Sequence, residues 1–528
     1  MTTSVFARAA VAAPHALATE AGRAVLEAGG DALEAMVAMA AMIAVAYPHM
    51  NSVGGDGFWL IREPSGKLRY IEACGFAGSK ATIEAYRAAE HETIPVRGPM
   101  AALTVPGAVA GWLLALDLSK ALGGRLPLAD LIAPAARCAR EGYRVSGAEA
   151  RAKWREEAAL AAAPGFADAF LNDNQRLTAG ETRRAPALAQ TLDQLAHAGL
   201  DDFYRGDVAR ELAADMERMG VPIVRDDLAT YRAVWRAPLT LALKGVLLAN
   251  AQPPTQGLAS LMILGIFDRL RVARAEGFEH IHGLIEASKR AILVRDRVCV
   301  DFDRLRDDPA SFLTASALAR EAEAISMTRA APWPAAPDAG DTVWMGAVDA
   351  KGLAVSYIQS VFWEYGSGCV LPRTGVHLQN RGTAFSLDPA ALNALAPGRR
   401  PFHTLNPALA VYDDGAVMPY GAMGGDGQPQ FQAQVFTRIA FGDGLAEAID
   451  RPRFLLGRTW GEESVTLKLE PRFDPSLVQR LQAAGHAVEM FQAPYVDACG
   501  HAGALRRRPN GAIEAAHDPR SDGGAAGL

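Results

Sequence analysis

A proline- and alanine-rich segment at residues 330–340 divides the sequence into two parts of different character. It holds three prolines among small residues, so it can neither continue a helix nor join a central strand. The chain before it is mostly helical in pattern, and the chain after it, from Asp341-Thr342 onward, is rich in predicted strands. We therefore expect a linker here that ends abruptly in a strand.

Two strand–turn–strand patterns come after the linker and predict antiparallel hairpins. The first covers Val343–Val348 and Leu353–Gln359, and the second covers Ala408–Tyr412 and Ala416–Tyr420. A third hairpin is expected much earlier, within residues 58–71. Helices and hairpins in this order predict α/β layers that enclose antiparallel strands.

Two helices stand out before the linker. Asp31 and Glu34 predict a capping box at the start of a helix that is apolar nearly all round and should be buried. A long helix is expected at Phe278–Val298, where His280 and His282 point to different faces, so we expect no metal pair. The same helix carries four charged residues on faces that could be solvated: Glu286, Lys289, Arg290 and Arg295.

Composition excludes several classes of protein. Half of the 528 residues are apolar and 21% are charged, as in a globular protein with a large core. The net charge of −6, with both signs interspersed, excludes nucleic-acid binding through a bulk basic field. Five cysteines without a C-x-x-C favour a reducing compartment, and no apolar run could span a membrane. We expect a cytoplasmic protein without nucleic-acid, membrane, metal or cofactor partners.

Thr342 is the first candidate for chemistry, because it begins a strand directly after the linker. Cleavage after Asp341 would leave it with a free α-amine. Threonine is a weak nucleophile, but an N-terminal threonine brings its own base, since an amine with a pKa of about 8 lies near its hydroxyl. The alternative is that Thr342 is only a β-branched strand residue.

A glycine loop is the second candidate. Gly424 and Gly425 come after a predicted strand and precede a helix that starts at Gln428-Pro429-Gln430. Their N–H groups and the helix dipole could form an oxyanion hole, or the loop could be only a tight turn. The tetrapeptide Gly-Gly-Asp-Gly occurs both here and at Gly54–Gly57, with nothing shared around it.

Together these segments resemble the γ-glutamyltransferase family of N-terminal-nucleophile hydrolases over almost the whole chain. The motifs that carry the resemblance are, in family order, Asn51–Phe58, Val105–Gly111, Ala133–Val145, Asp296-Arg297, Asp341-Thr342 with its hairpin, Arg400–Thr404, and Met423–Gly425.

The resemblance implies a four-layer αββα fold with antiparallel sheets and a proenzyme that cleaves itself before Thr342. A large subunit, 1–341, and a small subunit, 342–528, would remain one intertwined heterodimer, with further dimerisation left open. Thr342 would be both nucleophile and, through its amine, general base. Ser360 falls where the family places a hydroxyl that orients the threonine. Gly424 and Gly425 fall at the family's oxyanion donors.

Four positions depart from the family's recognition of a glutamyl α-amine and α-carboxylate. Cys74 stands where the family has an arginine, and Phe362, Arg381 and Ala384 stand where it has amine acceptors. An arginine facing a buried ammonium group is unfavourable, so recognition of an α-ammonium is expected to be lost. Arg381 instead suits a small anionic amide. The alternative is a surface or ion-paired arginine.

Neighbouring residues complete the expected substrate site. His403-Thr404 replaces the family's paired serines, and Asn380 and Thr404 are expected to help Arg381 hold a carboxylate, with Phe362 narrowing the pocket. His403 could equally be a buried histidine that only supports the site.

This pattern resembles the oxamate amidohydrolase branch of the family, which implies hydrolysis of oxamate to oxalate and ammonia, a late step in purine nitrogen salvage. Two enzymatic alternatives remain: a γ-glutamyl hydrolase or transferase acting on glutathione-like substrates, and a related acylase. A third alternative is not an enzyme but an uncleaved binding or scaffold protein.

Overall fold

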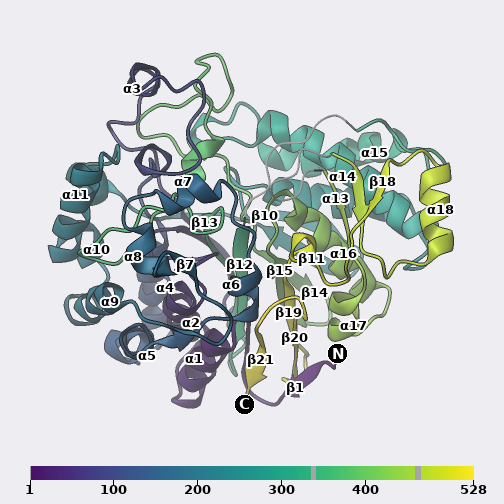
Figure 1. Cartoon of the computed structure of the whole chain (residues 1–528). Coiled ribbons are helices and arrows are strands. Elements are labelled where there is room, and N and C mark those ends of the chain that lie inside the picture. Colours follow the sequence, from purple (N-terminus) through teal and green to yellow (C-terminus); the bar gives the residue numbers. More distant parts are fainter. Residues whose placement is uncertain (1, 334–340, 458–464) are drawn as a thin grey trace.

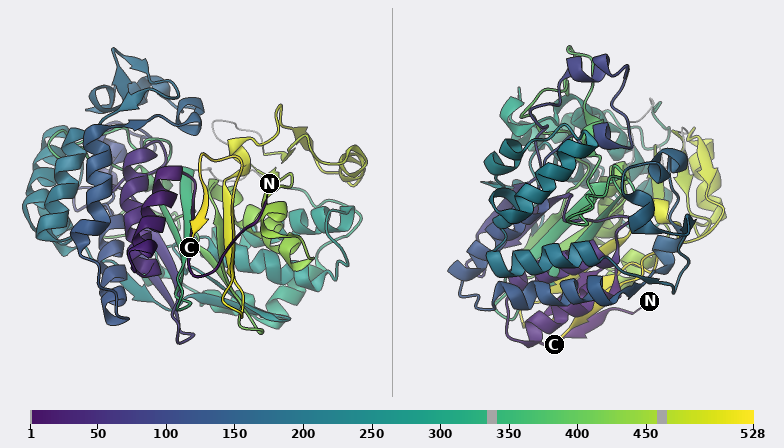
Figure 2. Two further views of the ribbon diagram at one scale, coloured as in Figure 1. Left: turned by 90° about the horizontal axis from the view of Figure 1, so that it is seen from below. Right: turned by 60° about the vertical axis from the view of Figure 1, so that its left-hand side comes forward.

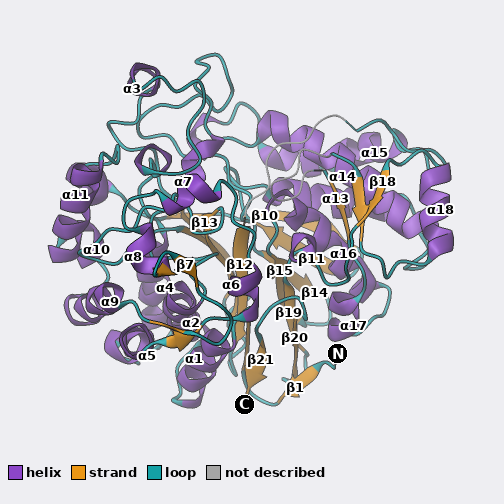
Figure 3. Cartoon of the chain, viewed as in Figure 1, coloured by secondary structure: helices purple, strands orange, loops and turns teal. Residues whose placement is uncertain are grey.

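Two seven-stranded antiparallel sheets pack face to face at the centre of the computed structural model, with helices on both outer sides (Figures 1 and 3). The structure describes residues 2–333, 341–457 and 465–528. This is the predicted αββα arrangement, and the view from below in Figure 2 shows the helical layers on either side of the strands. Most of the predicted linker, residues 334–340, lies outside the described residues.

The first sheet interleaves strands from before and after the linker. Its pairings are antiparallel throughout. In sheet order its strands are β21 (Gly524–Gly527), β2 (Ala10–Ala13), β12 (Asp341–Val348), β13 (Ala354–Phe362), β3 (Asp56–Arg62), β4 (Leu68–Ala73) and β9 (Val234–Arg236).

The second sheet is interleaved in the same way, and it contains the predicted hairpin that begins at residue 408. In sheet order its strands are β1 (Ser4–Phe6), β20 (Ile513–His517), β19 (Ala502–Arg507), β15 (Val417–Ala422), β14 (Ala408–Tyr412), β11 (Val246–Asn250) and β10 (Leu239–Leu243).

Each sheet packs its outer face against its own helices. The helices on the first sheet's side are α1 (Ala16–Glu27), α2 (Ala32–Ala46), α4 (Ala108–Ala121), α5 (Leu128–Glu141), α9 (Pro186–Ala198), α10 (Asp202–Arg205), α11 (Asp207–Met219) and α12 (Arg225–Thr230). Those on the second sheet's side are α13 (Gly257–Arg269), α14 (Phe278–Val298), α15 (Ala315–Glu323), α16 (Gln428–Ala440), α17 (Leu445–Asp450) and α18 (Pro475–Ala483). None of the described helices is both long and apolar enough to cross a membrane.

Several shorter elements lie outside the two large sheets and the helices that cover them. A three-stranded sheet beside α18 consists of β16 (Phe454–Leu456), β17 (Leu467–Leu469) and β18 (Val488–Met490). The remaining short elements are α3 (Ile83–Ala88), α6 (Gly147–Arg151), α7 (Glu157–Ala161), α8 (Phe166–Phe170), and the two-residue strand pairs β5 (Tyr143–Arg144) with β8 (Thr182–Arg183) and β6 (Leu171–Asn172) with β7 (Gln175–Arg176).

The alternation of side chains along β12 sets the direction of its first residues. Val343 and Met345 belong to the core between the first sheet and its helices, whereas Trp344 and Val348 belong to the core between the two sheets. Successive side chains of a strand point to opposite faces. Thr342, two positions before Trp344, therefore starts on the face that looks toward the second sheet.

The predicted helices are present, with one correction. Asp31 and Glu34 form the capping box of α2, and α14 has the predicted bounds. However, the prediction of solvated faces on α14 was wrong for Glu286, Lys289 and Arg295, which are at most 4% exposed. These charges are buried because each has a charged partner: Glu286 and Lys289 pair with each other, and Arg295 pairs with acidic groups, one of them distant in sequence.

Candidate active site

A β-bulge lies where the candidate nucleophile begins its strand. Asp341 pairs with Phe362 and Val343 pairs with Gln359, so Thr342 faces two residues of β13, Ser360 and Val361, instead of one. Bulges of this kind redirect side chains and are frequent beside active sites. The bulge brings Ser360 toward Thr342 from the neighbouring strand.

The Thr342 hydroxyl is held from two sides. Its Oγ1 donates to Ser360 Oγ at 3.4 Å, and it accepts a hydrogen bond from Gln428 Nε2 at 3.3 Å. Ser360 Oγ also accepts the backbone N–H of Phe362 at 2.9 Å. Thr342 is completely buried. The structure thus brings the predicted Thr342 and Ser360 together, and it adds Gln428, which sequence reasoning recognised only as part of a helix start.

The glycine pair lies just before that glutamine. Gly424 and Gly425 adopt φ values of 122° and 52°, in the region that disfavours side chains, and lead into a 3₁₀ turn and then α16. A Cβ at Gly424 would lie 2.6 Å from the Phe431 ring. Gln428, three residues after Gly425, contacts Thr342. The N-terminus of α16 and its positive dipole end are therefore close to the candidate nucleophile.

Arg295 and Gln256 support the glycine loop. The Arg295 guanidinium donates through one Nη to Asp426 Oδ1 at 2.8 Å and to Gln256 Oε1 at 2.7 Å. Gln256 in turn donates to the carbonyl oxygens of Gly425 and Thr404, both at 2.7 Å. Arg295, expected on a solvated face, is instead the buried cation that fixes this loop. The motif that carries the family resemblance in this helix consists only of the next two residues, Asp296 and Arg297.

Arg381 is buried beside a strained aromatic residue. Its Cζ lies 3.5 Å from the centre of the Phe362 ring, and one Nη donates to Thr404 Oγ1 at 3.4 Å. Phe362 has a φ of 81°, a conformation that costs about 1–3 kcal/mol and is concentrated at functional sites. The ring lies under the guanidinium, where a cation–π contact adds stabilisation. Arg381 thus contacts two other predicted residues, Phe362 and Thr404.

Asn380, also predicted, is occupied by the backbone. Its Nδ2 donates to Val96 O at 2.9 Å, and its Oδ1 accepts the Trp363 N–H at 3.1 Å. The amide therefore braces the turn after β13, next to Phe362 and Arg381.

His403 and Asp56 form a buried polar pair beside Arg381. His403 Nε2 lies 3.4 Å from Asp56 Oδ2, and both side chains are at most 1% exposed. Burial, together with the charges of Arg381 and Arg400, holds the pKa of His403 well below its usual range, so the ring is neutral. His403 was predicted at this site, but its carboxyl partner was not.

Asp56 is directly opposite Ser360 in the pairing of β3 with β13. Burial raises the pKa of this carboxyl to about 7, although the N–H groups of Gly75 and Gly107, at 2.9 and 3.1 Å, favour its charged form. The sequence signals for Asp56 were its place in a Gly-Gly-Asp-Gly motif ahead of an apolar strand and within Asn51–Phe58, one of the motifs that carry the family resemblance. Thr342, Ser360 and Asp56 therefore lie on three adjacent strands at one end of the sheet.

Possible metal ligands are few in this site. Within the described ranges, one group of three or more His, Cys, Asp or Glu side chains has metal-like spacing, and it lies on α14 and beside β18. The predicted absence of a metal at Thr342 remains a prediction. Cys74, in the place of the family's arginine, is buried with a pKa raised by desolvation, so its thiol is neutral.

Two antiparallel sheets between helical layers, with a threonine at the start of a central strand beside a glycine loop, define the fold of an N-terminal-nucleophile hydrolase. The family model of gamma-glutamyltranspeptidase matches residues 18–528. The chain belongs to this family and is one of its enzymes.

Several known proteins align with almost the whole chain. It is 53% identical to the oxamate amidohydrolase proenzyme of Klebsiella pneumoniae, covering 98% of this chain and 97% of that protein. It is 30% identical to the glutathione hydrolase proenzyme of Escherichia coli, covering 97% and 90%. The crystal structure of cephalosporin acylase from Bacillus halodurans superposes with a TM-score of 0.90 at 30% identity, covering 100% of this chain and 97% of that one.

Proposed function

We propose that the chain is a self-processing amidohydrolase with an N-terminal threonine nucleophile, and that it hydrolyses a small anionic amide such as oxamate to oxalate and ammonia. The observation that carries the proposal is the Thr342 hydroxyl held between Ser360 and Gln428, with the buried Arg381 lying against Phe362, two residues after Ser360. The 53% identity to an oxamate amidohydrolase proenzyme supports the substrate class.

Self-processing begins with attack of Thr342 Oγ1 on the carbonyl carbon of Asp341. The C–N bond breaks as the acyl group moves to oxygen, and the nitrogen takes the hydroxyl proton. Water then hydrolyses the ester, which leaves a carboxylate on Asp341 and a free amine on Thr342. The products, residues 1–341 and 342–528, stay associated because their strands share both sheets.

Turnover uses the new terminus. The Thr342 amine accepts the hydroxyl proton as Oγ1 attacks the amide carbon, and the N–H groups of Gly424 and Gly425 stabilise the oxyanion. Collapse of the tetrahedral intermediate releases ammonia, and the amine then activates a water that hydrolyses the acyl-threonine ester. Ser360 and Gln428 keep the hydroxyl in position throughout. These steps need only the chain's own groups and water.

Arg381 binds the substrate carboxylate. Its guanidinium lies on the Phe362 ring and shares a hydrogen bond with Thr404, so its orientation is fixed before substrate arrives. Asn380 assists by bracing the adjacent turn, and the neutral His403 adds no charge beside the anion. A substrate α-ammonium would meet Arg381 and is disfavoured.

We place the enzyme in the cytoplasm, in the breakdown of purine-derived nitrogen. All five cysteines are free, as expected for a reducing compartment.

Denaturing electrophoresis and intact mass of the purified chain test the processing step. We expect two fragments that divide before Thr342, and one uncleaved chain for Thr342→Ala, with amide hydrolysis lost by at least about 10³-fold. A wild-type chain that stays intact on long incubation would support the scaffold alternative.

A substrate comparison tests the chemistry. We expect ammonia release from oxamate with kcat/KM far above the value for glutathione or a γ-glutamyl anilide. The reverse preference would show that the roles given to Cys74 and Arg381 are wrong and that the enzyme acts on γ-glutamyl substrates.

A further inference from the structure

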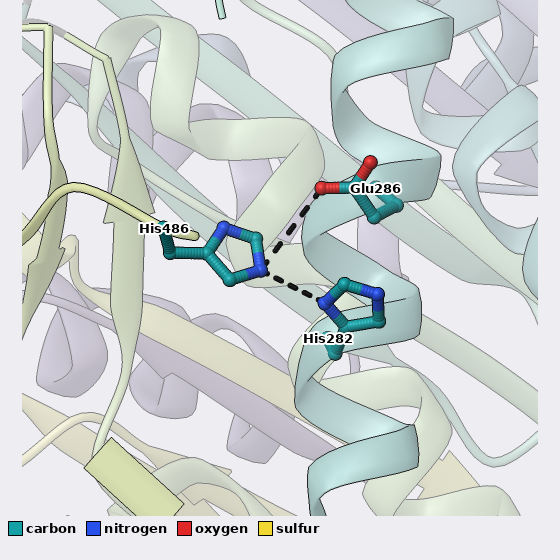
Figure 4. A group of neighbouring side chains, drawn as sticks. All are labelled: His282, Glu286 and His486. Carbon is teal, nitrogen blue, oxygen red and sulfur yellow. Dashed lines mark hydrogen bonds and ion pairs between the residues drawn. The ribbon is translucent and has the colours of Figure 1, made fainter. Parts of the chain in front are cut away.

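Two buried histidines and a glutamate meet where α14 contacts the turn between α18 and β18 (Figure 4). His282 and Glu286 lie one turn apart on α14, so they share a face, and His486 faces them from the turn between α18 and β18. One nitrogen or oxygen from each lies within 4.8 Å of the others. All three side chains are nearly inaccessible to solvent.

We propose that this cluster is a binding site for a Zn²⁺-class transition metal, with His282 Nδ1, His486 Nε2 and Glu286 Oε1 as its ligands. Two imidazoles and one carboxylate are a common zinc donor set. Nothing in the proposed hydrolysis uses these residues.

The protonation of His282 already suits a metal. Its Nε2 lies 2.8 Å from the carbonyl oxygen of Ser326, which requires the ring proton on Nε2 and leaves the Nδ1 lone pair facing the cluster. A backbone carbonyl that fixes the tautomer in this way is the usual support of a metal-bound histidine.

His486 supplies the second nitrogen. Its Nε2 lies 2.8 Å from His282 Nδ1 and 4.0 Å from Glu286 Oε1. Two ring nitrogens this close must share a proton, and since the proton of His282 lies on Nε2, His486 Nε2 is the donor. One proton therefore lies between the two histidine nitrogens in the metal-free site.

A metal would take the place of that proton. Ligand nitrogens about 2.05 Å from a tetrahedral zinc are roughly 3.3 Å apart, so the two rings must separate by about half an ångström while Glu286 moves inward. The proton of His486 moves from Nε2 to Nδ1 of the same ring, so the histidine stays neutral when the metal binds. A pocket of about 270 Å³, lined by His486, Lys289 and Ala331 among others, lies beside the cluster, and a water from it would be the fourth ligand.

Lys289 competes with the metal for the Glu286 carboxylate and therefore limits the affinity of the site for Zn²⁺. Its Nζ donates to Glu286 Oε1 at 2.7 Å, and it also donates to Ala331 O at 2.6 Å. The second acceptor allows the ammonium group to release the carboxylate without losing every partner, but its charge remains close to the metal. We therefore expect micromolar affinity, weaker than that of a dedicated structural zinc site.

The ligands come from both sides of the junction at Thr342. If the chain cleaves as proposed, His282 and Glu286 belong to the large subunit and His486 to the small one, so a bound metal would join the two products.

The test is a titration of tag-free protein with Zn²⁺, and with Co²⁺ to read ligand-field bands, on both the wild type and Thr342→Ala. The Thr342→Ala variant makes the result independent of cleavage. Failure of this metal site and failure of the proposed function can therefore be told apart. We expect one saturable site per chain in both proteins. No saturable uptake at 100 µM metal would overturn the proposal.

Variants identify the ligands. His486→Gln should weaken binding by at least 100-fold and Glu286→Gln by at least tenfold, while Lys289→Met should tighten it by at least tenfold. His280→Gln is the matched control, since His280 is a buried histidine of the same helix that contacts Thr437 instead. Equal affinities in His486→Gln and His280→Gln would overturn the assignment, as would Lys289→Met leaving affinity unchanged.

Discussion

The same tetrapeptide, Gly-Gly-Asp-Gly, lies at two places in the site and has a different structure in each. Gly54–Gly57 runs into the buried strand β3, whereas Gly424–Gly427 turns into a helix. The difference comes from the next residues along the chain, because Phe58–Ile61 is an apolar strand sequence and Gln428-Pro429 starts a helix. Four identical residues therefore do not determine a local structure on their own.

The two aspartates also meet different partners. Asp56 accepts two backbone N–H groups and faces His403, and its pKa is raised to about 7. Asp426 binds the Arg295 guanidinium, and burial raises its pKa only to about 6. Both carboxyl groups interact electrostatically with Arg381. The difference lies in the partners: Asp426 is paired with a buried guanidinium, whereas Asp56 meets backbone N–H groups and a neutral histidine.

Asp426→Asn should have the largest effect on stability. It leaves the buried Arg295 with Asp296 as its remaining acid partner, and removing one member of a buried pair costs about 3–5 kcal/mol. Urea unfolding at pH 7.5 measures the loss. Adding Arg295→Met should recover part of it; a double variant less stable than Asp426→Asn would contradict this view of the pair.

Gly424→Ala should damage catalysis more than folding. A methyl group at a φ of 122°, 2.6 Å from Phe431, forces the loop to move and misplaces the N–H groups of the proposed oxyanion hole. Loss of one such donor lowers kcat by about 10²–10³-fold. Single-turnover rates measure this, with Gly442→Ala, a glycine of positive φ and open surroundings, as control. Equal kcat values in the two variants would remove Gly424 from the mechanism.

Asp56→Asn should change how stability depends on pH. The folded-state pKa of about 7 is above the ordinary 3.8, so the folded protein binds more protons than the unfolded chain between these values. Its contribution to stability is thus present at low pH and is lost as pH rises from about 4 to 7. The asparagine variant should lack this loss and gain about 1–3 kcal/mol relative to wild type at pH 8. Thermal unfolding from pH 5 to 8 measures it; parallel curves would show that Asp56 does not titrate there.

Phe362→Leu should have the smallest effect. It keeps an apolar side chain but removes the ring under Arg381, a contact of about 0.5–2 kcal/mol. We expect KM for the anionic amide to rise severalfold with kcat nearly unchanged. A fall in kcat at constant KM would mean that Phe362 positions Thr342 rather than Arg381.

Sequence patterns located the residues whose signal is local. Thr342 comes directly after a linker, Gly424 and Gly425 join a strand to a helix, and Asp31 with Glu34 caps α2, so short windows suffice. Residues whose role depends on distant partners were missed. Arg295 is buried because Asp426, 131 positions later, neutralises it, and Gln428 reaches a hydroxyl 86 positions earlier. No helical periodicity contains that information.

The interleaved sheet has a consequence for recovery after denaturation. β12 lies between β2, from before the junction, and β13, from after it, so a cut at Thr342 creates a chain end inside a completed sheet. The uncut chain can regain this arrangement as a single molecule. Two separated fragments would have to associate and pair their strands in both sheets. Association of two molecules is a second-order reaction, so it slows on dilution. If the chain cleaves as proposed, the enzyme would be assembled once, before cleavage, and would not regain its structure after the fragments separate.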